Sequence, residues 1–213
     1  MIVLPLQQLY QNHDFNRKLE DIFSITLRLL SAFCWNYKES FICSTMATVL
    51  SHIGTLKFNN QTVKKIITLD KFLIGKDNKT MLGLALYREG INAQNLPLQF
   101  LSFSKIVNIQ YTGKQQIYQI NKIVGSLNSD KAVARIQALK QSSKDVGEQL
   151  YKSGRCAIAH AYNKPIVDPD DPTDLYRLYQ DIPIIKEVAE YIITNELSLE
   201  EIILQKPSSK FQN

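Results

Sequence analysis

The feature that most constrains the fold is the helical spacing of apolar residues from Lys79 onward. Apolar side chains recur there at steps of three and four, which predicts a series of amphipathic helices. Residues 79–92, 97–109 and 115–127 each predict a helix, and Pro97 suits a first-turn position. A fourth helix is predicted from Asp130 to about His160, with a bend at its glycines.

The segment after residue 165 predicts the start of a last helix. Asp171 is the expected N-cap, Pro172 takes the first helical position, and Asp174 places a negative charge in the first turn. Pro183 is expected to kink this helix or to divide it after Asp181. The second part of the chain is therefore predicted to be a bundle of about five helices.

The N-terminal part of the chain has a different pattern. Asp14 can cap an amphipathic helix over residues 15–37. β-Branched and aromatic residues in 41–58 and 62–72 then predict two or three short strands. The expected fold class is α+β, mainly α: an N-terminal helix plus short β-strands, followed by a helical bundle. The expected units are 1–78, 79–204 and a flexible tail at 205–213.

Composition narrows the class of function. The 213 residues carry a net charge of +5, which permits a polyanionic partner such as RNA. The three cysteines (Cys34, Cys43 and Cys156) form no CxxC pattern, which argues against a zinc site or a disulfide framework. The N-terminus lacks the basic region of a signal peptide, and no apolar run is long enough to span a bilayer. These features predict a cytoplasmic protein without a membrane partner.

Residues 153–165, SGRCAIAHAYNKP, combine small apolar residues with Arg155 and His160. On an ideal helix these two side chains lie about 140° apart, on either side of a stripe of small residues. The small residues allow a second copy of the helix to approach closely, so that a two-fold axis would gather two arginines and two histidines. An imidazole can exchange protons at neutral pH, and a guanidinium can hold a phosphate, so this cleft suits RNA phosphodiester cleavage without a metal.

The motif Arg155–Cys–Ala–Ile–Ala–His160 resembles the R-x(4–6)-H motif of the HEPN superfamily (higher eukaryotes and prokaryotes nucleotide-binding). Residues 84–107 resemble the helix pair of the ApeA-like HEPN proteins. LYKSGRCAIAHA and the segment 167–192 resemble bacterial proteins named methylamine-utilisation protein J. The resemblance covers roughly residues 79–197. It implies a metal-independent endoribonuclease without a cofactor, and a homodimer through the helix that carries the motif. Toxin or antiviral defence, with an antitoxin or sensor partner, is a common role of such relatives.

The resemblance also implies roles for individual residues. Arg155 would bind the scissile phosphate, His160 would act as acid or base, and Glu89 in LYREG matches an acidic residue that some members use. Polar and basic residues around the motif are predicted RNA contacts: Lys152, Asn163 and Lys164. The sequence departs from the family at Cys156, where active members often carry a polar residue.

Other interpretations of these residues stay open. Arg155 and His160 can be structural, with partners among the nearby carboxylates of Asp168, Asp170 and Asp171. The domain can then be a catalytically degenerate HEPN-like module that dimerises or binds RNA or protein, and a nucleotide-binding role is a third alternative. The same acidic run lacks the glycine and final glutamate of a calcium loop, which favours turn and cap roles. The positions of Tyr176 and Tyr179 predict a helix core or its edge rather than base stacking.

Overall fold

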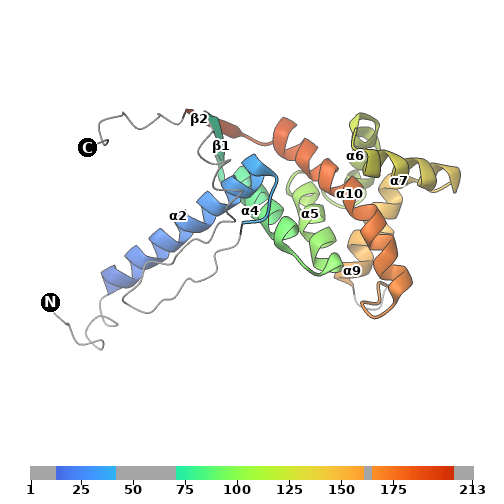
Figure 1. The fold of residues 1–213 in the computed structure, drawn as a ribbon, viewed down its shortest axis with the longest axis horizontal. Helices are drawn as coiled ribbons and strands as arrows, with labels where there is room; N and C mark the ends of the chain where they lie inside the picture. Colours follow the sequence, from blue (N-terminus) through green and yellow to red (C-terminus); the bar gives the residue numbers. More distant parts are fainter. Residues whose placement is uncertain (1–12, 42–70, 161–164, 204–213) are drawn as a thin grey trace, which may run out of the picture.

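The computed structural model describes residues 13–41, 71–160 and 165–203. Within these ranges the protein is an α+β fold that is mainly helical, as the sequence predicts (Figure 1). The longer elements are α2 (His13–Tyr37), β1 (Lys71–Gly75), α4 (Asn78–Asn92), α5 (Leu96–Gln110), α6 (Gln115–Ile123), α7 (Asp130–Gln141), α10 (Pro172–Asn195) and β2 (Leu199–Ile203).

Helix starts follow the capping residues in the sequence. The Asn95 side chain accepts the Leu98 N–H at 3.1 Å and begins α5, with Pro97 in the first turn. The Asp171 carboxylate accepts the Thr173 N–H at 2.8 Å and begins α10 at Pro172. The helices predicted over 79–92, 97–109 and 115–127 are therefore confirmed as α4, α5 and α6, and the predicted start of α10 is correct.

The single bent helix predicted from Asp130 to His160 is wrong. Helix α7 ends at Gln141, and Ser143 takes a left-handed conformation with φ 54°. The chain then restarts at an Asp145 cap with the short α8 (Val146–Glu148). Gly147 does not bend the helix: a Cβ atom there would lie within 3.0 Å of the Ile117 carbonyl oxygen, so glycine allows close packing on α6.

Helix α10 continues without a break through Pro183, so the division after Asp181 does not occur, and the alternative, a kink at Pro183, stays a prediction. Proline removes one backbone hydrogen bond from a helix interior. The residues on both sides of it, Ile182, Ile184 and Ile185, are buried in the core, and their burial offsets that loss.

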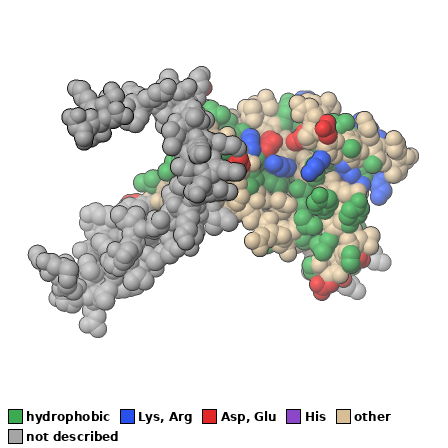
Figure 2. Space-filling view, in the orientation of Figure 1, with side chains coloured by type: hydrophobic (Ala, Val, Ile, Leu, Met, Phe, Trp, Pro, Cys, Tyr) green, Lys and Arg blue, Asp and Glu red, His purple; other side chains and the backbone are tan. Residues whose placement is uncertain are grey.

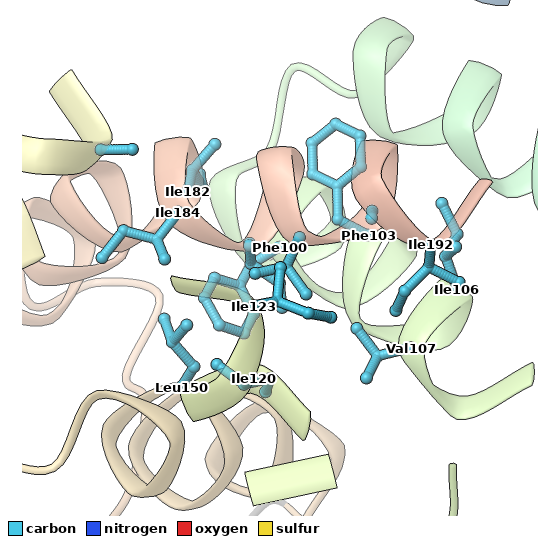
Figure 3. Packing of buried hydrophobic residues seen from close by; sticks show 14 of the residues in the cluster. Phe100, Phe103, Ile106, Val107, Ile120, Ile123, Leu150, Ile182, Ile184 and Ile192 are labelled. Atoms are coloured by element: carbon cyan, nitrogen blue, oxygen red, sulfur yellow. The ribbon is translucent and has the colours of Figure 1, made fainter. Parts of the chain in front are cut away.

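The core is built around α5, which packs against both α4 and α10. Phe100, Phe103 and Ile106 of α5 are fully buried. Figure 3 shows the cluster that they form with isoleucines of α6 and α10 and with Leu150. The N-terminal helix α2 joins the same core through Trp35, whose ring packs edge-on against Tyr87 with centroids 5.1 Å apart.

The sheet pairs the two strands antiparallel, with Lys71 opposite Ile203 and Gly75 opposite Leu199. The predicted strand segment 62–72 reaches β1 with its last two residues, and the rest of it lies outside the described residues, as do 42–58 and the tail 205–213. Strand β2 was not predicted. The sheet joins residues from both sides of the predicted boundary at 78, and the division into units stays a prediction.

Asn36 of α2 covers the free edge of β1. Its side-chain Nδ2 donates to the Leu73 carbonyl oxygen at 2.7 Å, and its Oδ1 accepts the Leu73 N–H at 2.9 Å. Half-buried backbone groups that would otherwise face an unpaired sheet edge are thereby satisfied.

Replacing Asn36 by alanine should lower the free energy of unfolding by about 2 kcal/mol, because two backbone groups of Leu73 lose their partner. Urea unfolding followed by circular dichroism measures this change. Asn195→Ala is the matched control, since its amide bonds only an exposed carbonyl of its own helix. Equal effects of the two substitutions would contradict this role of Asn36.

No helix in the described ranges is both long and apolar enough to cross a bilayer.

Candidate functional site

The segment that carries the Arg–His motif is a distorted helix. After α8, residues Gln149–Cys156 form the π-helix η2, and Ala157–Ala159 form the short α9. π-Helical turns are rare and occur frequently at functional sites. In this register the Ala157 N–H donates to the Lys152 and Gly154 carbonyls instead of the Ser153 carbonyl, its partner in a regular α-helix.

Helix α10 holds η2 in this conformation. The released Ser153 carbonyl accepts a hydrogen bond from Arg177 Nη1, and Arg177 is itself fixed by Asp174 at 3.0 Å. The backbone N–H of Asp168, and secondarily the Arg177 guanidinium, hold the pKa of Asp174 below its ordinary value. The π-helix therefore depends on a side chain 24 residues further along the chain.

A second contact anchors the start of η2. The fully buried Asp181 carboxylate accepts Arg135 Nε at 2.8 Å and Gln149 Nε2 at 3.1 Å. This cluster joins α7, η2 and α10. Sequence analysis missed it, although a signal exists: Asp181 lies three residues after Leu178 and four before Ile185, within the apolar face of α10.

Gly154 is the third constraint on η2. A Cβ atom there would lie within 3.0 Å of Cζ and Cε1 of the buried Phe100 ring. Only glycine lets the backbone approach α5 so closely. The residue directly before the motif arginine is thus fixed against the core, which sets where Arg155 leaves the segment.

Arg155 is half-buried and has no carboxylate partner among the described residues. Its Nη1 lies 3.7 Å from the Cys156 sulfur, and its guanidinium carbon lies 5.8 Å from the centroid of the Tyr151 ring. Burial first, and then the neighbouring Cys156 thiol, raise the pKa of the Tyr151 phenol above its ordinary value. The guanidinium is left with donors for an anion.

His160 is exposed and lies where the helix ends. Its backbone is extended (φ −124°, ψ 104°), and its N–H donates to the Cys156 carbonyl at 3.0 Å. The ideal-helix angle between Arg155 and His160 therefore does not apply, because η2 is π-helical and α9 stops at Ala159. Arg155 and His160 nevertheless both lie near the C-terminal end of the segment formed by η2 and α9.

Two of the apolar residues between Arg155 and His160 face inward, whereas Ala159 is exposed. Ala157 is buried, and Ile158 is half-buried against the main core cluster. They pack on their own protein, so a second copy would have to meet the outer residues of this segment. Dimerisation through the segment stays a prediction.

The other predicted site residues have separate positions. Lys152 is exposed and forms an ion pair with Glu148 one turn away, which raises the pKa of Lys152. Glu89 is exposed on α4, and no described hydrogen bond or ion pair links it to the motif. Asn163 and Lys164 lie outside the described residues.

The acidic run after the motif serves the turn before α10. Asp168 accepts the Asp170 N–H at 2.9 Å, and Asp171 caps the helix. In the part of the chain that the structure describes, none of these carboxylates bonds Arg155 or His160. No three His, Cys, Asp or Glu side chains there gather as a metal-ligand set, and independence from a cofactor stays a prediction.

Fold and segment together define a mainly helical α+β protein in which Arg155 lies at the end of a π-helical segment and His160 follows the short α9. The chain belongs to the family described as methylamine utilization protein MauJ, whose model matches residues 83–194, more than half of the chain. The match confirms the resemblance to methylamine-utilisation protein J and lies within the predicted span 79–197. Comparison with curated proteins and with solved structures gives no match.

Proposed function

We propose that this protein is a metal-independent endoribonuclease of the HEPN type that cleaves RNA by transesterification. Membership of the MauJ family supports this proposal, since MauJ-like proteins are HEPN-related. The proposal includes a homodimer formed through the segment of Arg155 and His160, a cytoplasmic location, and a role in toxin or antiviral defence with an antitoxin or sensor partner.

The observation that carries the proposal is that the Arg155 guanidinium has no carboxylate partner among the described residues. Three other cations around the segment each have a carboxylate partner: Lys152 with Glu148, Arg177 with Asp174, and Arg135 with Asp181. Arg155 has none within the described residues and contacts only a thiol and an aromatic ring. A half-buried guanidinium without an internal partner is suited to a forked contact with a phosphate.

In the proposed reaction, His160 removes the proton of a ribose 2′-hydroxyl, and that oxygen attacks the adjacent phosphorus. The bond from phosphorus to the 5′-oxygen of the next nucleotide breaks, and that oxygen takes a proton from the partner subunit's His160. The products are a 2′,3′-cyclic phosphate and a 5′-hydroxyl. Arg155 offsets the charge that accumulates on the phosphate oxygens in the transition state.

The test is incubation of the purified full chain with labelled RNA in EDTA, followed by separation of the products and analysis of their ends. Cleavage to cyclic phosphates is expected, and His160→Ala and Arg155→Ala should each reduce the rate by about 100-fold or more. Arg28→Ala is the matched control, because Arg28 is an exposed arginine of α2 outside the motif. Absence of cleavage by the wild type, or cleavage by the alanine variants at the wild-type rate, would refute the proposal.

Cys156 favours a second candidate function, a catalytically degenerate HEPN-like domain that dimerises or binds RNA or protein. Its thiol occupies the place where active members often carry a polar residue, and it lies against Arg155 Nη1. This candidate predicts no cleavage by the wild type, with or without EDTA, and a dimer in solution that sedimentation analysis detects.

A further inference from the structure

A long groove follows one face of α10, separate from the Arg–His motif. It encloses about 1350 Å³, with α7 and the loop 126–129 on one side and the start of α5 on the other. The lining residues of α10 recur at steps of three and four: Tyr176, Tyr179, Pro183, Glu187, Glu190 and Thr194. This face is about 27 Å long at a rise of about 1.5 Å per residue.

Two tyrosines form an aromatic platform at one end of the groove. Tyr176 and Tyr179 are 61 % and 57 % exposed, so neither lies in the core, and the alternative position at its edge stays a prediction. Their rings stack, with centroids 6.5 Å apart and an angle of 24° between the planes. Both tyrosines are exposed to solvent, and single-stranded nucleic acid stacks its bases on exposed aromatic side chains.

Cations line the groove beside this platform. Lys131 and Arg135 come from α7, and Lys186 comes from α10. Figure 2 shows lysine and arginine side chains next to an apolar patch on this face.

The residues that line the groove carry four positive and three negative charges, and the carboxylates are those of Asp130, Glu187 and Glu190. Glu187 accepts the Asn128 and Ser129 N–H groups, and Glu190 accepts the Tyr87 hydroxyl. Lys131 is exposed and has no ion-pair partner among the described residues. Lys186 lies 3.9 Å from Glu190 and Arg135 is held by the buried Asp181, so Lys131 is the lining cation best placed to meet a phosphate.

We propose that this groove binds a short stretch of single-stranded RNA, with bases on Tyr176 and Tyr179 and phosphates beside Lys131 and Lys186. The volume exceeds the roughly 300–1,000 Å³ of small-molecule pockets. The walls combine apolar side chains with cations and side-chain amides, and two exposed tyrosines beside the exposed Lys131 fit stacked bases and their phosphates. A single strand is preferred to a duplex because a duplex hides its base faces. The choice of RNA over DNA rests on the proposed function.

The test is fluorescence anisotropy with the full chain and a labelled, unstructured oligonucleotide of about ten nucleotides. A 2′-O-methyl RNA is used because it lacks the nucleophile for cleavage, so binding is measured whether or not the protein is a nuclease. Tyr176→Ala and Tyr179→Ala should each raise Kd by about 5-fold to 100-fold, and Tyr179→Phe should stay within about twofold of wild type. Lys131→Ala should weaken binding and reduce the slope of log Kd against log salt by about 0.7.

Tyr118→Ala is the matched control, because Tyr118 is 68 % exposed on α6 and does not line the groove. It should bind like the wild type. The proposal is overturned if the wild type does not bind, if a duplex of the same length binds as tightly, or if the platform variants bind as tightly as Tyr118→Ala. If Arg155→Ala or His160→Ala impairs cleavage but leaves groove binding unchanged, the groove and the motif are two separate sites. If neither variant impairs cleavage, that result counts against the proposed function alone.

Discussion

Replacing Asp181 by alanine should lower the free energy of unfolding by about 3–4 kcal/mol, the cost of leaving a buried charge without its partner. The Asp181 side chain is fully buried, and its two oxygens bond Arg135 and Gln149. Arg135, with only 17 % of its side chain exposed, would keep its charge without the carboxylate. Urea unfolding measures the loss.

The control for Asp181→Ala is Glu148→Ala, which removes a carboxylate from an exposed ion pair with Lys152. Exposed pairs contribute little, so the unfolding midpoint should not change measurably. The loss of unfolding free energy for Asp181→Asn should lie between those of Asp181→Ala and Glu148→Ala, because an amide can still accept one hydrogen bond. If Asp181→Ala were as mild as Glu148→Ala, the cluster would not anchor η2.

The second large effect is expected for Gly154→Ala. Alanine is the better helix former by about 1 kcal/mol, yet the variant should lose about 2 kcal/mol of stability because its Cβ would overlap the Phe100 ring. The ring is fully buried within the main cluster and cannot move aside without disturbing the core. Because Gly154 directly precedes Arg155, RNA cleavage should fall as well if the proposed function holds.

Gly125→Ala is the matched control, since a Cβ atom there meets no other atom within 4 Å. It should leave stability unchanged or slightly higher. In a Phe100→Leu background, Gly154→Ala should cost at least about 1 kcal/mol less than in the wild type, as expected for two residues in direct contact. If the stability effects of Gly154→Ala and Phe100→Leu were additive, the clash with the Phe100 ring would not be the cause of the stability loss.

The elements that the sequence predicts well are those specified by neighbouring residues. Asn95 with Pro97, and Asp171 with Pro172, begin helices because each cap satisfies N–H groups two or three residues away. The spacing of apolar residues also locates α4, α5 and α6, because this signal too comes from residues close together in the sequence. The resemblance to methylamine-utilisation protein J, which lies within residues 79–197, is likewise confirmed by the match over 83–194.

The wrong or missing predictions concern interactions between distant segments. The π-helix forms where Arg177 takes the Ser153 carbonyl and Gly154 meets Phe100, contacts that local spacing does not contain. Helix α10 continues through Pro183 because its flanking isoleucines are buried. The catalytic roles of Arg155 and His160 rest on spacing and resemblance and stay a prediction, and the ideal-helix angle expected between them does not apply to a π-helix.

Strand β1 has its partner at the far end of the described chain, since Lys71 lies opposite Ile203. During translation β1 leaves the ribosome long before β2, and its hydrogen-bonding edge toward β2 stays unpaired while the intervening helices are made. The sheet therefore forms late in biosynthesis. The chain between the two strands must lose conformational entropy before their pairing can compensate for that loss. A nascent chain that stalls after α10 would retain an open edge, the kind of surface on which other chains aggregate.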